Sequence, residues 1–437
     1  MMNHVFELVN KQFRSPARRQ LMFMLMATVT GSALTLVVQM VLGMLLPPDE
    51  FGEIRLIWGY FLLAAPFVLL GVVAPLGRLA ISPRSHARRL LYWRETLRWW
   101  RIPGVIVTLG LAGFSLMGWI TVNPTLMVPL AVMMLSVPLW CMTDLYQTFW
   151  KFIRARNMAS IGLFVAKLGL LVGLLLVWLR PFETAALNFS SGYVLGMLGA
   201  VLGLHLMHGR ATATLEPCDT HDRLNAREWG VVKRFMPVAL IANVVNVLAV
   251  QMDVILMDRF AIDPHEVGLY LFAMMFAATV LLVQDPVISF LLPELGTVNE
   301  REPERLARKV LVYQAALSGF MLMMAVAMVV VVPYLITWFF DEAYRDASRY
   351  LPYVGLVAVV QGSMGILYQG LFVRNQMHLS TLFTMIATLI ALCTAVLLMP
   401  HYGLWGLIIG KLTGGVVFAV LGITALLRFQ GVKMHDN

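Results

Sequence analysis

Long apolar runs alternate with short polar stretches along this chain, and the length of each run indicates its structure. A transmembrane helix needs roughly 20 mostly apolar residues to cross about 30 Å of hydrocarbon. Twelve stretches have about that length. They are 20–46, 54–76, 102–122, 125–149, 158–179, 187–208, 233–257, 266–292, 309–336, 350–373, 379–399 and 404–427. The pattern predicts an all-α polytopic membrane protein of about twelve transmembrane helices.

The composition supports this prediction. Hydrophobic residues make up 59% of the 437 positions and charged residues 13%, whereas soluble domains average about 45–50% and 25%. A chain of this length cannot hide so much apolar surface in a water-soluble core. Lipid is therefore its main solvent.

The basic residues predict the orientation in the membrane. With a cytoplasmic N-terminus, 26 of the 33 Lys and Arg lie on the cytoplasmic side, as the positive-inside rule requires. The other seven are Arg180, Arg259, Arg345 and Arg349 outside, and Arg55, Lys167 and Lys411 within spans. We expect both termini in the cytoplasm. The net charge of +9 then reflects topology and contact with anionic membrane lipids, and it does not imply nucleic acid.

The chain divides into two halves that resemble each other. The polar stretch 209–232 separates a six-span bundle at 1–208 from a second at 233–437. The run Pro48-Asp-Glu-Phe-Gly52 recurs 216 residues later as Pro264-His-Glu-Val-Gly268. Because six spans is an even number, the two copies share one orientation, which is a parallel repeat typical of several transporter folds. Chance similarity between apolar segments is the alternative.

The polar connections are short, which limits the chemistry they can hold. None exceeds about 30 residues, and no G-x-x-x-x-G-K-[ST] phosphate-binding motif occurs. The three cysteines include no C-x-x-C pair of the kind that binds metal. We expect no enzymatic activity, no cofactor and no metal site.

Basic residues inside the predicted spans are candidates for substrate binding, because a charge within the membrane is costly. Lys167 lies near the middle of its span, Lys411 about a third of the way into the last span, and Arg55 at the start of the second. Together they form a candidate cationic cavity for an anionic headgroup such as a pyrophosphate. The alternative is that each pairs with a carboxylate or extends its charged end to the membrane surface.

Acidic residues within the spans are candidates for ion coupling. They are Asp144, Asp253 and Asp285. A buried carboxylate with a raised pKa can carry a coupling proton or help to bind Na⁺. A capping, pairing or anchoring role is the alternative.

Several segments resemble a known family. The stretch from Gln251 to Tyr270 is similar to the seventh span and following loop of polysaccharide transporters. Leu292-Pro-Glu-Leu-Gly296, Leu46-Pro-Pro-Asp-Glu-Phe-Gly52 and His401-Tyr-Gly-Leu-Trp-Gly406 also resemble turns of that family. The family includes the O-antigen (Wzx-type) flippases and belongs to the multidrug/oligosaccharidyl-lipid/polysaccharide (MOP) exporter superfamily.

The resemblance implies two six-helix bundles with a V-shaped cavity between them. It implies flipping of an isoprenoid-pyrophosphate-linked oligosaccharide across the bacterial inner membrane by alternating access. The partners would be the lipid-linked glycan and the polymerase and glycosyltransferases of a polysaccharide pathway. Family members often place basic residues in the passage, a role that would fall to Lys167, Lys411, Arg55 and, at the outer mouth, Arg259.

Other functions remain open. A cation-coupled drug or metabolite antiporter of the same superfamily would share the fold but should carry deep acidic residues in its N-terminal half, where this chain has Lys167. A membrane-embedded glycan polymerase or ligase typically needs a long outer loop. A scaffold of an envelope polysaccharide system is a further alternative.

Overall fold

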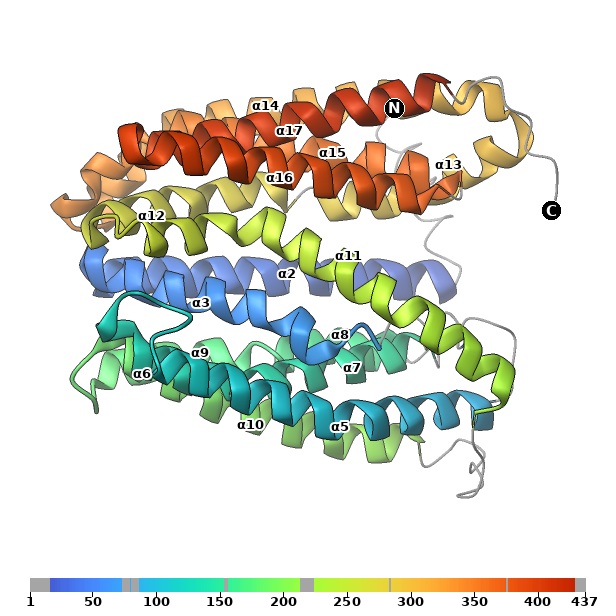
Figure 1. Ribbon diagram of the computed structural model, residues 1–437, viewed down its shortest axis with the longest axis horizontal. Helices are drawn as coiled ribbons and strands as arrows, with labels where there is room; N and C mark the ends of the chain where they lie inside the picture. Colours follow the sequence, from blue (N-terminus) through green and yellow to red (C-terminus); the bar gives the residue numbers. More distant parts are fainter. Residues whose placement is uncertain are drawn as a thin grey trace, which may run out of the picture. The chain divides into compact units, whose positions relative to one another are not determined.

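The computed structural model describes residues 16–72, 79, 86–152, 156–212, 224–282, 284–374 and 376–428. These residues form α-helices and one 3-10 helix, shown in Figure 1. In chain order they are α2 (Pro16–Leu45), α3 (Pro48–Leu69), α5 (His86–Leu116), α6 (Pro124–Met134), α7 (Val137–Phe152), α8 (Arg156–Val165), α9 (Leu168–Leu179), α10 (Ala185–Thr212), α11 (Ala226–Arg259), α12 (Pro264–Leu281), α13 (Gln284–Arg301), α14 (Pro303–Phe339), η1 (Glu342–Arg349), α15 (Leu351–Val373), α16 (Met377–Tyr402) and α17 (Leu404–Arg428). The predicted all-α fold class is confirmed.

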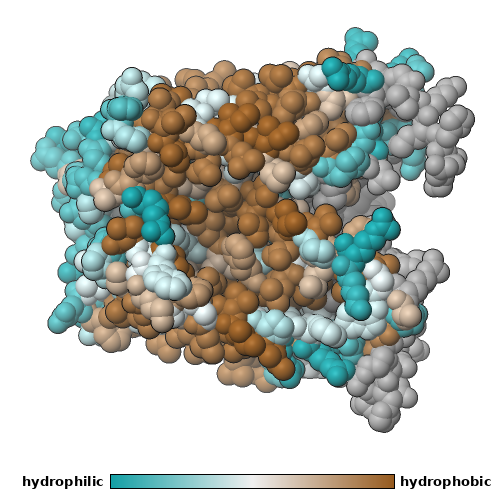
Figure 2. Space-filling model, viewed as in Figure 1, coloured by the Kyte–Doolittle hydropathy of each residue, from teal (hydrophilic) through white to brown (hydrophobic). Residues whose placement is uncertain are grey.

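Eleven membrane-crossing helices are found among the described residues by length and composition, with α6–α7 and α8–α9 each counted as one. In α2 the apolar part, Val29–Leu45, is shorter. Figure 2 shows hydrophobic residues over the middle of the helices and hydrophilic ones towards their ends. Leu202 and Leu397 are 62% and 70% exposed, as expected of side chains that face lipid. The chain therefore has a multi-pass membrane architecture.

Two of the predicted spans differ from the helices observed. α5 starts at His86, well before position 102, because the basic stretch rich in Leu and Trp is helical too. The span predicted at 266–292 is wrong in its second half, since α12 ends at Leu281 and α13 begins at Gln284. The sequence has Pro286 directly after this break, and proline has no N–H to donate to the carbonyl four residues earlier.

One membrane-crossing helix is interrupted by a proline. α6 ends at Met134 and α7 starts at Val137. Pro138 lacks the N–H that would bond to the Met134 carbonyl. The backbone N–H of Ser136 instead donates to Met133 O at 3.0 Å, a tighter turn than that of an α-helix.

The chain forms two compact units, and each is described by itself. The first comprises residues 1–38 and 57–244, and the second 39–56 and 245–437. The predicted division into bundles at 1–208 and 233–437 with a linker at 209–232 stays a prediction.

In the first unit, glycines bring α9 and α10 into close contact. A Cβ on Gly192 would lie 2.6 Å from Val172 O, and one on Gly196 would lie 2.5 Å from Leu168 O. Both distances are too short for any larger residue. Small residues allow membrane helices to approach closely, which increases their dispersion contacts.

In the second unit, the two similar motifs of the sequence lie against each other. A Cβ on Gly268 would lie 1.9 Å from Pro48 O, and a Cβ on Gly52 would lie 2.9 Å from Gly268 N. His265 and Asp49, which occupy equivalent motif positions, are joined at 3.1 Å. The start of α3 and the start of α12 are therefore held together backbone to backbone.

η1 covers the same end of the second unit. The buried Tyr344 donates from its hydroxyl to Leu46 O at 2.9 Å. Arg349 and Tyr350 both donate to the Glu266 carboxylate. The bond to Glu266 raises the pKa of Arg349, and burial followed by the same carboxylate raises the pKa of Tyr350 to about 12. Both groups therefore keep their protons at any physiological pH. The contact of Arg349 and Tyr350 with Glu266 does not depend on pH within that range.

Candidate functional site

α17 is the element that positions Lys411. Its glycines face α16, where a Cβ on Gly410 would lie 2.7 Å from Ala391 O and one on Gly414 the same distance from Ala387 O. Only glycine permits this approach. The close packing fixes α17 on one side and directs Lys411, between these glycines, towards α11.

Lys411 and Asp253 form a buried ion pair within the second unit. The Lys411 Nζ lies 2.6 Å from Asp253 Oδ2 and donates to Val250 O at 3.3 Å. The two side chains are 1% and 5% exposed. The Lys411 ammonium is therefore matched by a carboxylate, which is the pairing that the sequence left open as the alternative to a free cationic site.

Two further groups surround the Asp253 carboxylate. Val254 donates its backbone N–H to Oδ1 at 3.1 Å, and the Tyr270 hydroxyl makes a long contact of 3.5 Å with Oδ2. Arg55 interacts with Asp253 electrostatically, and its Nε is buried without a hydrogen-bond partner. The structure therefore joins two predicted site residues, Lys411 and Asp253, directly and places a third, Arg55, within electrostatic range of the same carboxylate.

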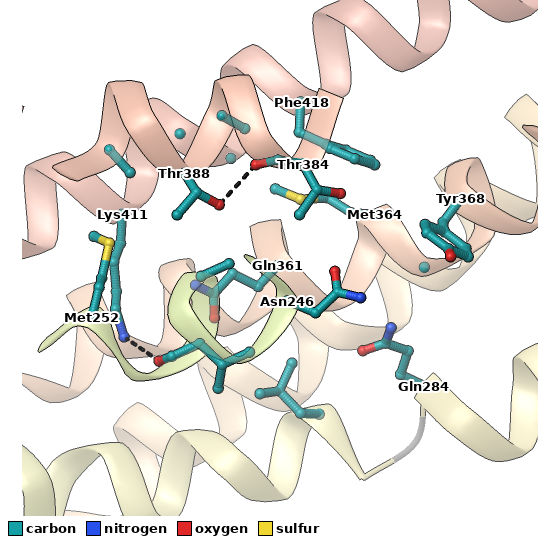
Figure 3. Close-up of a pocket in the computed structure, with 18 of the residues that line it drawn as sticks. Asn246, Met252, Gln284, Gln361, Met364, Tyr368, Thr384, Thr388, Lys411 and Phe418 are labelled. Atoms are coloured by element: carbon teal, nitrogen blue, oxygen red, sulfur yellow. Dashed lines mark hydrogen bonds between the residues drawn. The ribbon is translucent and has the colours of Figure 1, made fainter. Parts of the chain in front are cut away.

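A cavity of about 430 Å³, with both polar and apolar side chains in its wall, adjoins Lys411 in the second unit (Figure 3). Its size falls in the range of about 300–1,000 Å³ found for small-molecule sites. Residues of α11, α12, α13, α15, α16 and α17 form its walls. Its polar lining consists of Asn246, Gln284, Gln361, Tyr368, Gln369, Thr384, Thr388 and Lys411.

Lys167 belongs to the first unit and lies at a break in a membrane-crossing helix. α8 ends at Val165 and α9 begins at Leu168, although no proline occurs between them. The Lys167 N–H donates to Phe164 O at 2.9 Å, so the chain makes one tight turn there. The Lys167 side chain lies beside Gly31 of α2, because a Cβ added to that glycine would lie 3.7 Å from the Lys167 Cε. The side chain is half-buried, near the middle of the candidate span Asn157–Leu179.

The break places a lysine directly before the first turn of a helix. The first amides of a helix have no intrahelical partner and carry a partial positive charge. Lys167 is the residue directly before α9, so its backbone lies at the positive end of that helix, and its Cε lies beside Gly31 of α2. Such a site favours an anion.

The remaining predicted residues lie apart from these two places. Asp144 is half-buried in α7 and interacts electrostatically with Lys151. Arg259 is the last residue of α11 and is exposed. Asp285 was expected inside a span, but it lies in the first turn of α13, and its side chain falls outside the described part of the chain. The proposed coupling and binding roles of these residues stay predictions.

The sequence analysis did not single out the amide side chains of the cavity. Asn246, Gln284 and Gln361 are uncharged, whereas the predicted site residues were all charged residues. The signal that could have found them is an amide inside an apolar span, since such a group also needs a hydrogen-bond partner in the membrane.

Comparison with solved structures shows what fold the chain has. An inward-facing multidrug resistance MATE family transporter of the MOP superfamily aligns with a TM-score of 0.64 at 14% identity, over 94% of this chain and 96% of that one. The lipid II flippase MurJ in an inward closed conformation aligns with a TM-score of 0.72 at 10% identity, over 93% and 87%. The eukaryotic MATE transporter AtDTX14 gives 0.58 at 13%, over 94% and 95%.

No protein-family profile matches the chain, and no curated protein sequence matches it significantly. The structural likeness, at these low identities, is a likeness of fold. It confirms the expected MOP-superfamily fold. The finer resemblance to polysaccharide transporters stays a prediction.

Proposed function

We propose that this chain is a flippase that moves an isoprenoid-pyrophosphate-linked oligosaccharide across the bacterial inner membrane by alternating access. Its fold is shared with transporters, one of which is described as a lipid II flippase. Both termini lie in the cytoplasm in this proposal. The glycosyltransferases and polymerase of a polysaccharide pathway would supply and consume the substrate.

The observation that carries the proposal is the position of Lys167. A pyrophosphate cannot enter hydrocarbon without compensation of its charge. Lys167 offers an ammonium and the amino end of α9 in the middle of a candidate span. Lys411 offers less, because Asp253 already balances its charge. We therefore assign the main contact with the pyrophosphate to Lys167, with Arg55 and Arg259 as further basic positions.

The test is transport by the purified full-length chain in proteoliposomes. The probe is a fluorescent isoprenoid pyrophosphate that bears a sugar, and dithionite reports its arrival in the outer leaflet. We expect Lys167→Ala to slow flipping about tenfold or more, because a hydrogen bond to a charged group contributes about 1.5–3 kcal/mol. Lys167→Arg should retain most of the rate. Arg428→Ala, at the exposed end of α17, is the matched control.

Two outcomes contradict this proposal. Full activity of Lys167→Ala would remove the assigned role of that residue. Absence of any flipping by the wild-type chain, with unchanged surface polysaccharide in a deletion strain, would exclude the function itself.

A second candidate function is a cation-coupled drug or metabolite antiporter. The buried Asp253–Lys411 pair beside a polar cavity favours it, because a proton or cation that displaces the ammonium could couple to movement of the helices. In that case Asp253→Asn should abolish drug efflux driven by an ion gradient. A deletion strain should then lose drug tolerance and keep its surface glycan.

A further inference from the structure

The cavity beside Lys411 in the second unit is lined by a group of amides from three different helices. Asn246 comes from α11, Gln284 from α13, and Gln361 and Gln369 from α15. Figure 3 shows the amides of Asn246 and Gln284 facing each other on the side of Tyr368, and the Gln361 amide on the side of Lys411. We call these four amide residues the amide cluster.

The amide cluster makes no hydrogen bond to any other residue that the structure describes. Each amide has two N–H donors and a carbonyl that accepts. Leaving such groups unpaired in a helix that crosses a membrane costs free energy. Asn246 is exposed and the other three amides are half-buried, so the cluster is free to bind a partner in the cavity that both donates and accepts hydrogen bonds.

The charge of the cavity indicates a neutral ligand. Lys411 is the one charged residue in the lining among the described residues, and its ammonium already bonds Asp253 and the Val250 carbonyl. A free anion would find no unpaired cation there. A free cation would find no unpaired carboxylate.

The rest of the cavity wall is apolar. Ile288, Met364, Ala387 and Phe418 line it together with glycines. Gly365 makes room for one of the amides, because a Cβ there would lie 2.3 Å from the Gln284 Nε2. A ligand that suits this site has hydroxyl groups on its edge and C–H groups on its faces, which is the chemistry of a sugar ring.

We propose that the amide cluster binds a neutral sugar, with hydroxyl groups bonded to Asn246, Gln284 and Gln361 and a ring face against Phe418. This inference rests on the proposed function, for which it names the part of the chain that holds a neutral sugar of the glycan. The pyrophosphate site at Lys167 in the first unit is a separate site. The cavity thus contributes selectivity for the glycan, and the lysine contributes affinity for the charge.

Binding of free sugars by the purified full-length chain tests the proposal. The protein is kept in a detergent without a sugar headgroup, and glucose, galactose, mannose, N-acetylglucosamine and glucuronate are titrated by saturation-transfer NMR. We expect saturable binding of at least one neutral sugar and no tighter binding of glucuronate. Gln284→Leu and Gln361→Leu should each raise the Kd at least fivefold, since each removes a hydrogen-bonding group and leaves a ligand hydroxyl unpaired.

Gln314→Leu is the matched control, because it makes the same change on α14 outside the cavity. Its Kd should equal that of the wild type. The proposal is overturned if the wild type binds no neutral sugar, or if the two cavity variants bind as tightly as Gln314→Leu does.

The flipping assay separates this inference from the proposed function. Flipping of the sugar-bearing lipid without saturable sugar binding overturns the inference alone. Sugar binding that depends on Gln361, combined with no flipping, supports the inference and overturns the proposed function.

Discussion

Charge at the residue scale is organised differently in the two units. In the second unit Lys411 is buried against Asp253, with Arg55 in electrostatic range of the same carboxylate. In the first unit Lys167 is half-buried at a helix break. The two lysines, Lys411 and Lys167, therefore lie in different electrostatic environments. Lys411 joins α17 to α11 through Asp253, whereas no carboxylate of the described residues is paired with Lys167.

The buried pair leads to a prediction about stability. Removal of one partner from a buried ion pair costs about 3–5 kcal/mol, because the other charge is left without compensation. We expect Asp253→Asn to lower the melting temperature more than Lys411→Met does. Asp253→Asn leaves two basic groups without a carboxylate, whereas Lys411→Met leaves Asp253 with Arg55 nearby. Melting of the purified variants, followed by intrinsic fluorescence, measures the difference.

The double variant Lys411→Met with Asp253→Asn completes the comparison. It removes both charges, so it should be more stable than Asp253→Asn alone. A double variant whose loss equals the sum of the two single losses would show that the pair contributes no coupling.

At the scale of elements, the positions of most helices could be predicted from the sequence. Hydrocarbon thickness fixes the length of each apolar run, and the observed Leu351–Val373 and Leu404–Arg428 lie close to the predicted 350–373 and 404–427. The break before Val137 had a visible cause in Pro138. The break at Lys167 had none, because no proline or polar run marks it. Local sequence gives no signal for a turn that tertiary contacts select.

The site was less accessible to prediction than the fold. Lys411 and Asp253 are separated by 158 positions, and no spacing rule relates two residues on distant helices. The charge of each residue identified it as a candidate, but only the folded chain shows that the two neutralise each other. The amides of the cavity carried no charge and gave no such signal.

The contact between the two similar motifs provides a prediction for an element. Because a Cβ on Gly268 would lie 1.9 Å from Pro48 O, Gly268→Ala must push the start of α3 away from the start of α12. Forcing extra atoms into a packed contact costs about 1–3 kcal/mol. We expect a lower melting temperature for Gly268→Ala.

Gly319→Ala in α14 is the control, because nothing lies within 4 Å of the new Cβ. We expect no loss of stability there, since alanine has a higher helix propensity than glycine. Equal melting of the two variants would contradict the close contact.

For the whole molecule, the membrane topology depends on every span at once. The positive-inside count requires an even number of crossings between sites that face the same side. The outer and inner connections alternate only if the interrupted pairs α6–α7 and α8–α9 each cross once, as their lengths indicate. One missed or additional span would reverse the side of every connection that follows it.

Accessibility of single cysteines tests this topology directly. In a chain in which Cys141, Cys218 and Cys393 are replaced, we expect Glu183→Cys and Glu342→Cys to react with a membrane-impermeant maleimide in intact cells, because both exposed positions lie in outer connections. Arg210→Cys and Glu302→Cys, exposed at the ends of helices on the opposite side, should react only after permeabilisation. The predicted topology places one crossing between Glu183 and Arg210, two between Arg210 and Glu302, and one between Glu302 and Glu342. Reaction of Arg210→Cys in intact cells would therefore show that α10 does not cross the membrane. Protection of Glu342→Cys in intact cells would show the same for α14. If all four react as expected, α10 and α14 each cross the membrane once, and an even number of crossings separates Arg210 from Glu302.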